Sequence, residues 1–186
     1  AVVMLPGRLT RWKGHGVFID AIADLKRRDI RCLVVGSDQG RTGYRRELEN
    51  LVHNNGLDEI VRIVDHCDDM PAAYMLTDVV VSASTDPEAF GRVVPEAQAL
   101  GRPVIATDHG GARETVIENV TGWLTPPGDA VALAAAIEKA LALPADRRRQ
   151  LAAAAIANVA ENFSKQAMSD KTLEIYDEVL QKEPLR

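Results

Sequence analysis

The sequence has few of the features that mark several common protein classes. Only two of its 186 residues are cysteines, Cys32 and Cys67, too few for a disulfide framework and without metal-site spacing. No apolar run approaches the roughly 18 residues that a membrane-spanning helix needs. The opening stretch, AVVMLPGRLT, lacks the charged lead and cleavage site of a secretory signal. We therefore expect a protein of the reducing cytoplasm.

Positive charge and phosphate-binding signatures are also scarce. The 22 Lys and Arg residues are outnumbered by 27 Asp and Glu residues, which gives a net charge of -5. This balance argues against a general nucleic-acid role, although it leaves room for a local basic site for a small anion. Neither G-x-G-x-x-G nor G-x-x-x-x-G-K-[ST] occurs, which argues against a dinucleotide dehydrogenase and against a P-loop enzyme.

The sequence does contain a regular alternation of short β-branched runs and helical patterns. This alternation predicts a doubly wound, parallel α/β sheet with helices on both faces, in one domain over 1–186. A strand at the second residue also suggests a domain of a longer protein. The expected strands are 2–5, 31–36, 60–64, 78–84 and 103–107, and the expected helices are 15–28, 44–56, 71–76, 92–100, 111–118, 129–142, 145–161 and 165–181.

Candidate binding residues follow the expected strands, where ligands gather in such folds. Arg8 and Lys13 come after the first strand and just before a helix. Two cations near a helix N-terminus can bind an anion, because the free N–H groups and the helix dipole add to the side-chain charge. The alternative is that both are solvated surface charges.

The stretch DPEAFGRVVPEAQALG, residues 86–101, follows the fourth strand. Pro95 fits only the first turn of a helix, which places the backbone amides of Gly91, Arg92 and Val93 at the open helix start. Such amides could hold a phosphate.

Two carboxylates flank that helix start. Glu88 lies in the preceding loop and Glu96 on the first turn or two. A carboxylate can accept two hydrogen bonds side by side, which suits the vicinal diol of a ribose. The arrangement therefore suits a sugar diphosphate, with one glutamate on the ribose and the other on the second sugar. The alternative for Glu96 is a favourable charge at a helix start, worth only ~0.3–1 kcal/mol.

After the fifth strand, TDHGGARET places Gly110 and Gly111 before another expected helix start. Glycine allows close approach of the backbone to another group. We expect this loop to point at the same crevice, with His109 as an ordinary loop residue.

Three motifs together, GRLTRWKG, PEAFGRVVPEAQALGRPVIAT and GGARETV, resemble the C-terminal domain of retaining family 4 glycosyltransferases. The resemblance covers residues from about 2 to 179. It implies half of a B-type fold, in which two Rossmann-like domains face each other, and an enzyme that uses a nucleotide diphosphate sugar without a metal or other cofactor.

The resemblance also implies roles for individual residues. Arg8 and Lys13 would stabilise the departing diphosphate, and Glu88 would contact the transferred sugar. The other contacts would come from the backbone of Phe90 and Gly91 to the sugar, the amides of Arg92 and Val93 to phosphate, and the side chain of Glu96 to the ribose, with Gly110 and Gly111 beside the donor.

The acceptor, whether a glycan, a lipid or a small molecule, would bind an N-terminal domain that this sequence lacks. The helix at 165–181 would pack on that domain; here its apolar stripe would be exposed or would pair with a second copy. The resemblance suggests bacterial glycan or lipopolysaccharide synthesis, with peripheral membrane association of the full-length enzyme. Two alternatives stay open: a nucleotide-sugar 2-epimerase of the same fold, and a non-catalytic nucleotide-binding module.

Overall fold

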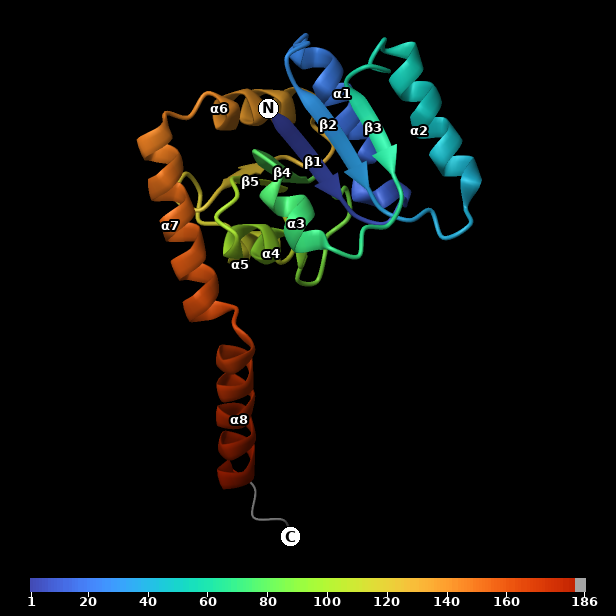
Figure 1. The fold of residues 1–186 in the computed structure, drawn as a ribbon. Coiled ribbons are helices and arrows are strands. Elements are labelled where there is room, and N and C mark those ends of the chain that lie inside the picture. The colour runs from blue at the N-terminus through green and yellow to red at the C-terminus, as the bar shows by residue number, and fades with distance from the viewer. Residues whose placement is uncertain (183–186) are drawn as a thin grey trace.

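The computed structural model describes residues 1–182, so the last four residues of the expected domain lie outside the described part. Its centre is a six-stranded, entirely parallel sheet in the order β3-β2-β1-β4-β5-β6 (Figure 1). This is the order of a Rossmann-like sheet, which confirms the predicted fold class. The strands are β1 (Val2–Pro6), β2 (Arg31–Val35), β3 (Val61–Val64), β4 (Val79–Ser82), β5 (Val104–Thr107) and β6 (Trp123–Thr125).

Helices cover both faces of the sheet, as the βαβ pattern requires. One face carries α1, α2 and α6, and α3, α4 and α5 lie on the other; α7 packs on α4. The helical elements are η1 (Arg11–Lys13), α1 (His15–Leu25), α2 (Thr42–Asn54), α3 (Met70–Met75), α4 (Val93–Ala99), α5 (Ala112–Thr115), α6 (Ala130–Leu141), α7 (Ala145–Asn162) and α8 (Lys165–Lys182).

The strands supply both hydrophobic cores by alternation. In β1, Val3 and Leu5 belong to the core under α1, α2 and α6, whereas Met4 points to the core under α3 and α4. Val80 in β4 faces the same side as Met4. Strand side chains alternate between the two faces of the sheet, so a strand with a helix layer on each face buries all of its side chains. This is why continuous apolar runs in the sequence predict central strands.

The boundaries differ most from the sequence-based expectation in three places. Helix α1 stops at Leu25 because Lys26 adopts a left-handed conformation, with φ of 52°. Helix α5 is a single turn that ends at Thr115. Strand β6 was not predicted, because its three residues are too few for a recognisable alternation.

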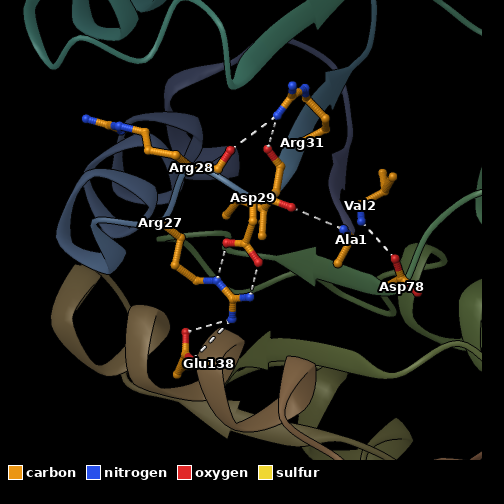
Figure 2. A network of polar contacts seen from close by, with 9 residues as sticks. Ala1, Val2, Arg27, Arg28, Asp29, Arg31, Asp78 and Glu138 are labelled. Atoms are coloured by element: carbon orange, nitrogen blue, oxygen red, sulfur yellow. Dashed lines mark hydrogen bonds and ion pairs between the residues drawn. The ribbon is translucent and has the colours of Figure 1, made fainter.

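A network of polar contacts lies near the amino ends of the strands (Figure 2). Arg27, just after α1, forms ion pairs with Asp29 and with Glu138 of α6. The Val2 N–H donates to an Asp78 carboxylate oxygen at 2.8 Å, which ties the start of β1 to the start of β4. These contacts lie near the amino ends of the strands, opposite to the carboxyl ends where ligands bind in such sheets, so we assign them to the stability of the fold.

Helix α8 extends away from the sheet and its covering helices (Figure 1). Six of its large apolar side chains are more than half exposed, and they include most of the predicted stripe: Met168, Leu173, Ile175, Tyr176, Val179 and Leu180. Across residues 1–182, no helix combines the length and the hydropathy of a membrane-spanning segment.

Candidate functional site

The site is built where the strand order reverses. Strands β1 and β4 are neighbours in the sheet, and the chain leaves them in opposite directions. In open α/β sheets, such a reversal marks the crevice at the carboxyl ends of the strands where ligands bind. The loop after β1 is fastened to the loop after β4, because the Thr85 N–H donates to the Trp12 carbonyl at 2.7 Å. Gly14 makes this approach possible: its φ is 72°, and a Cβ there would lie 1.8 Å from the Ala83 carbonyl oxygen.

An ion pair joins two of the predicted site residues, one after β1 and the other after β4. Lys13 Nζ lies 2.8 Å from Glu88 Oε2, and the two side chains are only 13% and 17% exposed. The ammonium also lies 4.5 Å from the centre of the Trp12 ring. A charge pair this sheltered from water is screened less than a surface pair. Its ammonium can neutralise an anion, and its carboxylate can accept hydrogen bonds from hydroxyl groups.

Glu88 has a second partner in Ser84, which the sequence did not indicate. The Ser84 hydroxyl donates a short hydrogen bond to Glu88 Oε1. The Ser84 carbonyl accepts from the Thr107 hydroxyl at 2.8 Å and lies 2.9 Å from His109 Nε2. These groups line a small cavity at the ends of β4 and β5. His109 lies in the loop after β5, as expected from the sequence, and its ring contacts this backbone carbonyl.

Gly110 and Gly111 bring the loop after β5 against the same segment. A Cβ at Gly110 would lie 2.3 Å from the Glu88 carbonyl oxygen, and one at Gly111 would lie 2.6 Å from the Phe90 carbonyl oxygen. The Gly111 N–H already donates to the Glu88 carbonyl at 2.9 Å. The close approach that we predicted here is thus made to the protein backbone, and the Gly111 amide is engaged within the chain.

Helix α4 begins as the sequence predicts, with Pro95 and Glu96 in its first turn. Its first backbone hydrogen bond is donated by Val94 to the Gly91 carbonyl, so the amides of Gly91, Arg92 and Val93 precede it. The Phe90 ring lies 5.9 Å from that of Phe163, at the end of α7, so Phe90 can reach the site mainly through its backbone.

Glu96 has partners different from those of Glu88. Its Oε2 accepts a hydrogen bond from the Tyr74 hydroxyl at 3.1 Å, and its Oε1 lies 3.9 Å from Arg92 Nε. The Glu96 side chain is 44% exposed and that of Arg92 is 84% exposed. Tyr74 is another residue that the sequence gave no reason to include.

Arg8 follows β1 and is exposed. The structure thus joins Glu88 to Lys13 and to the 110–111 loop, whereas Arg8 and Glu96 are exposed. Larger hollows lie elsewhere on the described surface: one of about 420 Å³ beside Phe90 and the start of α8, and one of about 340 Å³ beside Trp123. Among residues 1–182, no group of His, Cys, Asp and Glu side chains could hold a metal ion.

Comparison with known protein families shows to which family the chain belongs. The family described as "Glycosyl transferases group 1" matches residues 1–158, which is most of the chain. The chain belongs to this family. A group 1 glycosyl transferase domain also explains why the polar residues gather at the carboxyl ends of β1, β4 and β5.

Three relatives of this glycosyl transferase domain are about twice as long as the chain. A D-inositol 3-phosphate glycosyltransferase from Xylanimonas cellulosilytica is 33% identical over the whole chain, which spans 44% of that protein. The crystal structure of a glycosyltransferase from Rickettsia africae ESF-5 is 38% identical, with a TM-score of 0.91 over 98% of the chain and 48% of its own. The structure of Anabaena Alr3699/HepE in complex with UDP and glucose is 32% identical, with a TM-score of 0.87 over 95% of the chain and 48% of its own. The chain thus spans about half the length of these proteins.

Proposed function

We propose that this chain is the donor-binding half of a retaining, family 4 glycosyltransferase that moves a sugar from a nucleotide diphosphate sugar to an acceptor. The observation that carries the proposal is the sheltered Lys13–Glu88 ion pair at the reversal between β1 and β4. Support for the donor class comes from the HepE neighbour, whose structure holds UDP and glucose.

In the proposed reaction, the bond between the anomeric carbon and the phosphate oxygen breaks, and its electron pair leaves with the diphosphate. The acceptor oxygen bonds to the same face of the sugar, and its proton passes to the departing phosphate. Lys13 and Arg8 neutralise the developing charge together with the amides of Gly91 to Val93, which is why no metal is invoked. Glu88 accepts hydrogen bonds from the sugar, and Glu96 from the ribose.

The chain covers less than half of the Xylanimonas relative, so we assign the acceptor to the other half of the enzyme. That acceptor would be a glycan, a lipid or a small molecule. Bacterial glycan or lipopolysaccharide synthesis in the cytoplasm is the setting we propose, with the full-length enzyme peripherally attached to the membrane.

Calorimetric titration of the chain with UDP, GDP and ADP tests the proposal. We expect saturable binding of at least one of them. Lys13→Met should weaken it by about ten- to a hundredfold, the cost of a lost charged hydrogen bond. Lys139→Met is the matched control, because Lys139 bonds to Asn119 beside the Trp123 hollow. Absence of binding by the unmodified chain, or equal affinities of the two variants, would contradict the proposal.

A further inference from the structure

Tyr74 is a buried side chain with one polar atom directed at the site. Its exposed fraction is 2%, and its ring packs in the core cluster that contains Val80 of β4 and Val94 of α4. The hydroxyl emerges from this cluster and donates to Glu96 Oε2. Burial raises the pKa of Tyr74, and the negative charge of Glu96 and the hydrogen bond to it raise this pKa further. The hydroxyl therefore keeps its proton and remains a donor at neutral pH.

The protein holds Tyr74 in place from both sides. Helix α3 starts at a fixed point, because the Asp69 side chain caps it by accepting from the Ala72 N–H at 3.0 Å. On the other side, Val94 and Ala97, which flank Glu96 along α4, belong to the same core cluster as the tyrosine ring. The distance from the Tyr74 hydroxyl to the Glu96 backbone is thus set by packed core.

The second partner of Glu96 is much less constrained. Arg92 is 84% exposed and lies 3.9 Å from Glu96 Oε1, at the limit of an ion pair. Exposed ion pairs four residues apart on a helix contribute little to stability. Without the tyrosine hydroxyl, the Glu96 carboxylate would be free to rotate toward solvent or toward Arg92.

We propose that Tyr74 is a positioning residue for nucleotide recognition: its hydroxyl holds Glu96 Oε2 so that the carboxylate faces the 2′- and 3′-hydroxyls of the bound nucleoside. This inference rests on the proposed function, in which Glu96 binds the ribose. Two hydrogen bonds to neighbouring hydroxyls require a fixed carboxylate plane, whereas one hydrogen bond does not. Tyr74 therefore controls the preference for ribonucleotides over 2′-deoxyribonucleotides.

Calorimetric titration with UDP, GDP, ADP and their 2′-deoxy forms measures this preference. In Tyr74→Phe, the ratio of ribonucleotide to deoxyribonucleotide affinity should fall by about three- to tenfold, which is part of the roughly ten- to hundredfold that one hydrogen bond to a charged group contributes. Tyr176→Phe, on exposed α8, is the matched control and should keep the ratio. Glu96→Gln should also lower the ratio of ribonucleotide to deoxyribonucleotide affinity. Adding Tyr74→Phe to Glu96→Gln should lower this ratio no further.

The possible outcomes separate this inference from the proposed function. A Tyr74→Phe variant that weakens both nucleotide forms equally would show a merely structural tyrosine and would overturn the inference alone. Thermal unfolding of each variant checks that the fold is kept. Tyr74→Phe keeps the buried ring and removes only the hydroxyl, so a change in the ratio without a change in unfolding temperature reports on the hydroxyl alone. If the unmodified chain binds none of the nucleotides, the proposed function fails, and this inference fails with it.

Discussion

At the scale of single residues, the two glutamates of the site are held in different ways. Glu88 has a protein partner on each oxygen, Lys13 and Ser84, and is only 17% exposed. Glu96 is 44% exposed, and Tyr74 is its firmly placed partner. In the proposed function, the sheltered carboxylate tied to an ammonium contacts the reacting sugar. The more open carboxylate contacts the ribose, which the nucleoside diphosphate and the nucleotide sugar share.

Substitution of each glutamate should therefore have a different effect. Glu96→Ala should weaken binding of a nucleoside diphosphate and of its nucleotide sugar alike, by about ten- to a hundredfold, because both ligands contain the ribose. Glu88→Ala should leave nucleoside diphosphate affinity nearly unchanged and should slow transfer in the full-length enzyme. Calorimetric titration of both variants with the nucleoside diphosphate separates them. Equal losses, or no loss in Glu96→Ala, would contradict this division of roles.

His15, the first residue of α1, makes stability depend on pH. It is fully buried, and burial lowers its pKa from 6.5 to about 4, with a smaller effect in the same direction from Lys13, although the backbone of Gly7 and Thr10 favours the charged form. Neither ring nitrogen forms a hydrogen bond with a described partner, and burial is the largest effect on the pKa of His15. The folded state therefore disfavours the protonated ring.

Because the folded pKa lies below the unfolded one, the stability associated with neutral His15 is complete above pH 6.5 and is lost as the pH falls toward 4. Between about pH 7 and about pH 5, the loss from this residue alone is about 2 kcal/mol. Urea unfolding of the unmodified chain and of His15→Gln over this range measures it. The variant should lose less stability than the parent, and parallel curves would show that His15 does not titrate this way.

At the scale of elements, the turn between η1 and α1 fixes where Lys13 lies. Gly14→Ala should cost about 2–5 kcal/mol, because the left-handed backbone disfavours alanine and the new methyl group would overlap the Ala83 carbonyl. Gly40→Ala is the matched control: Gly40 also has a positive φ, 78°, but its Cβ would meet nothing within 4 Å. We expect about 1–2 kcal/mol there. Chemical unfolding gives both values, and similar losses would mean that the contact with β4 is unimportant.

The sequence predicted five of the six strands and the helices between them, because parallel strands buried on both faces form continuous apolar runs. It also predicted that Lys13 and Glu88 lie near each other, because each follows a parallel strand and the carboxyl ends of parallel strands lie at the same end of the sheet. It could not predict that Tyr74 meets Glu96, 22 residues away, or that Ser84, Thr107 and His109 form a network. Those contacts depend on the packing of α3 on α4 and on the register of β4 with β5, neither of which leaves a local pattern.

At the scale of the whole molecule, the chain spans 44% of the Xylanimonas relative and 48% of the Rickettsia structure. The cavity beside Glu88 is small. We predict that the isolated chain binds a nucleoside diphosphate weakly and transfers no sugar, because transfer needs both halves to align the reactants and exclude water. Incubation with UDP-glucose and a panel of acceptors, followed by assay of released UDP, measures this. Robust transfer by the purified chain would show that the second half is dispensable.

The tie between Val2 and Asp78 has a consequence for biosynthesis. The central strand β1 pairs with β4 as well as β2, and the two residues of that tie are 76 positions apart. A ribosome that adds about 5–20 residues per second needs ~4–15 s to cover this distance. During that interval, one edge of β1 has no partner strand, and its apolar residues are available to chaperones or to neighbouring nascent chains. Slowed translation between β2 and β4 should therefore reduce the soluble yield of this protein more than the same delay after β5.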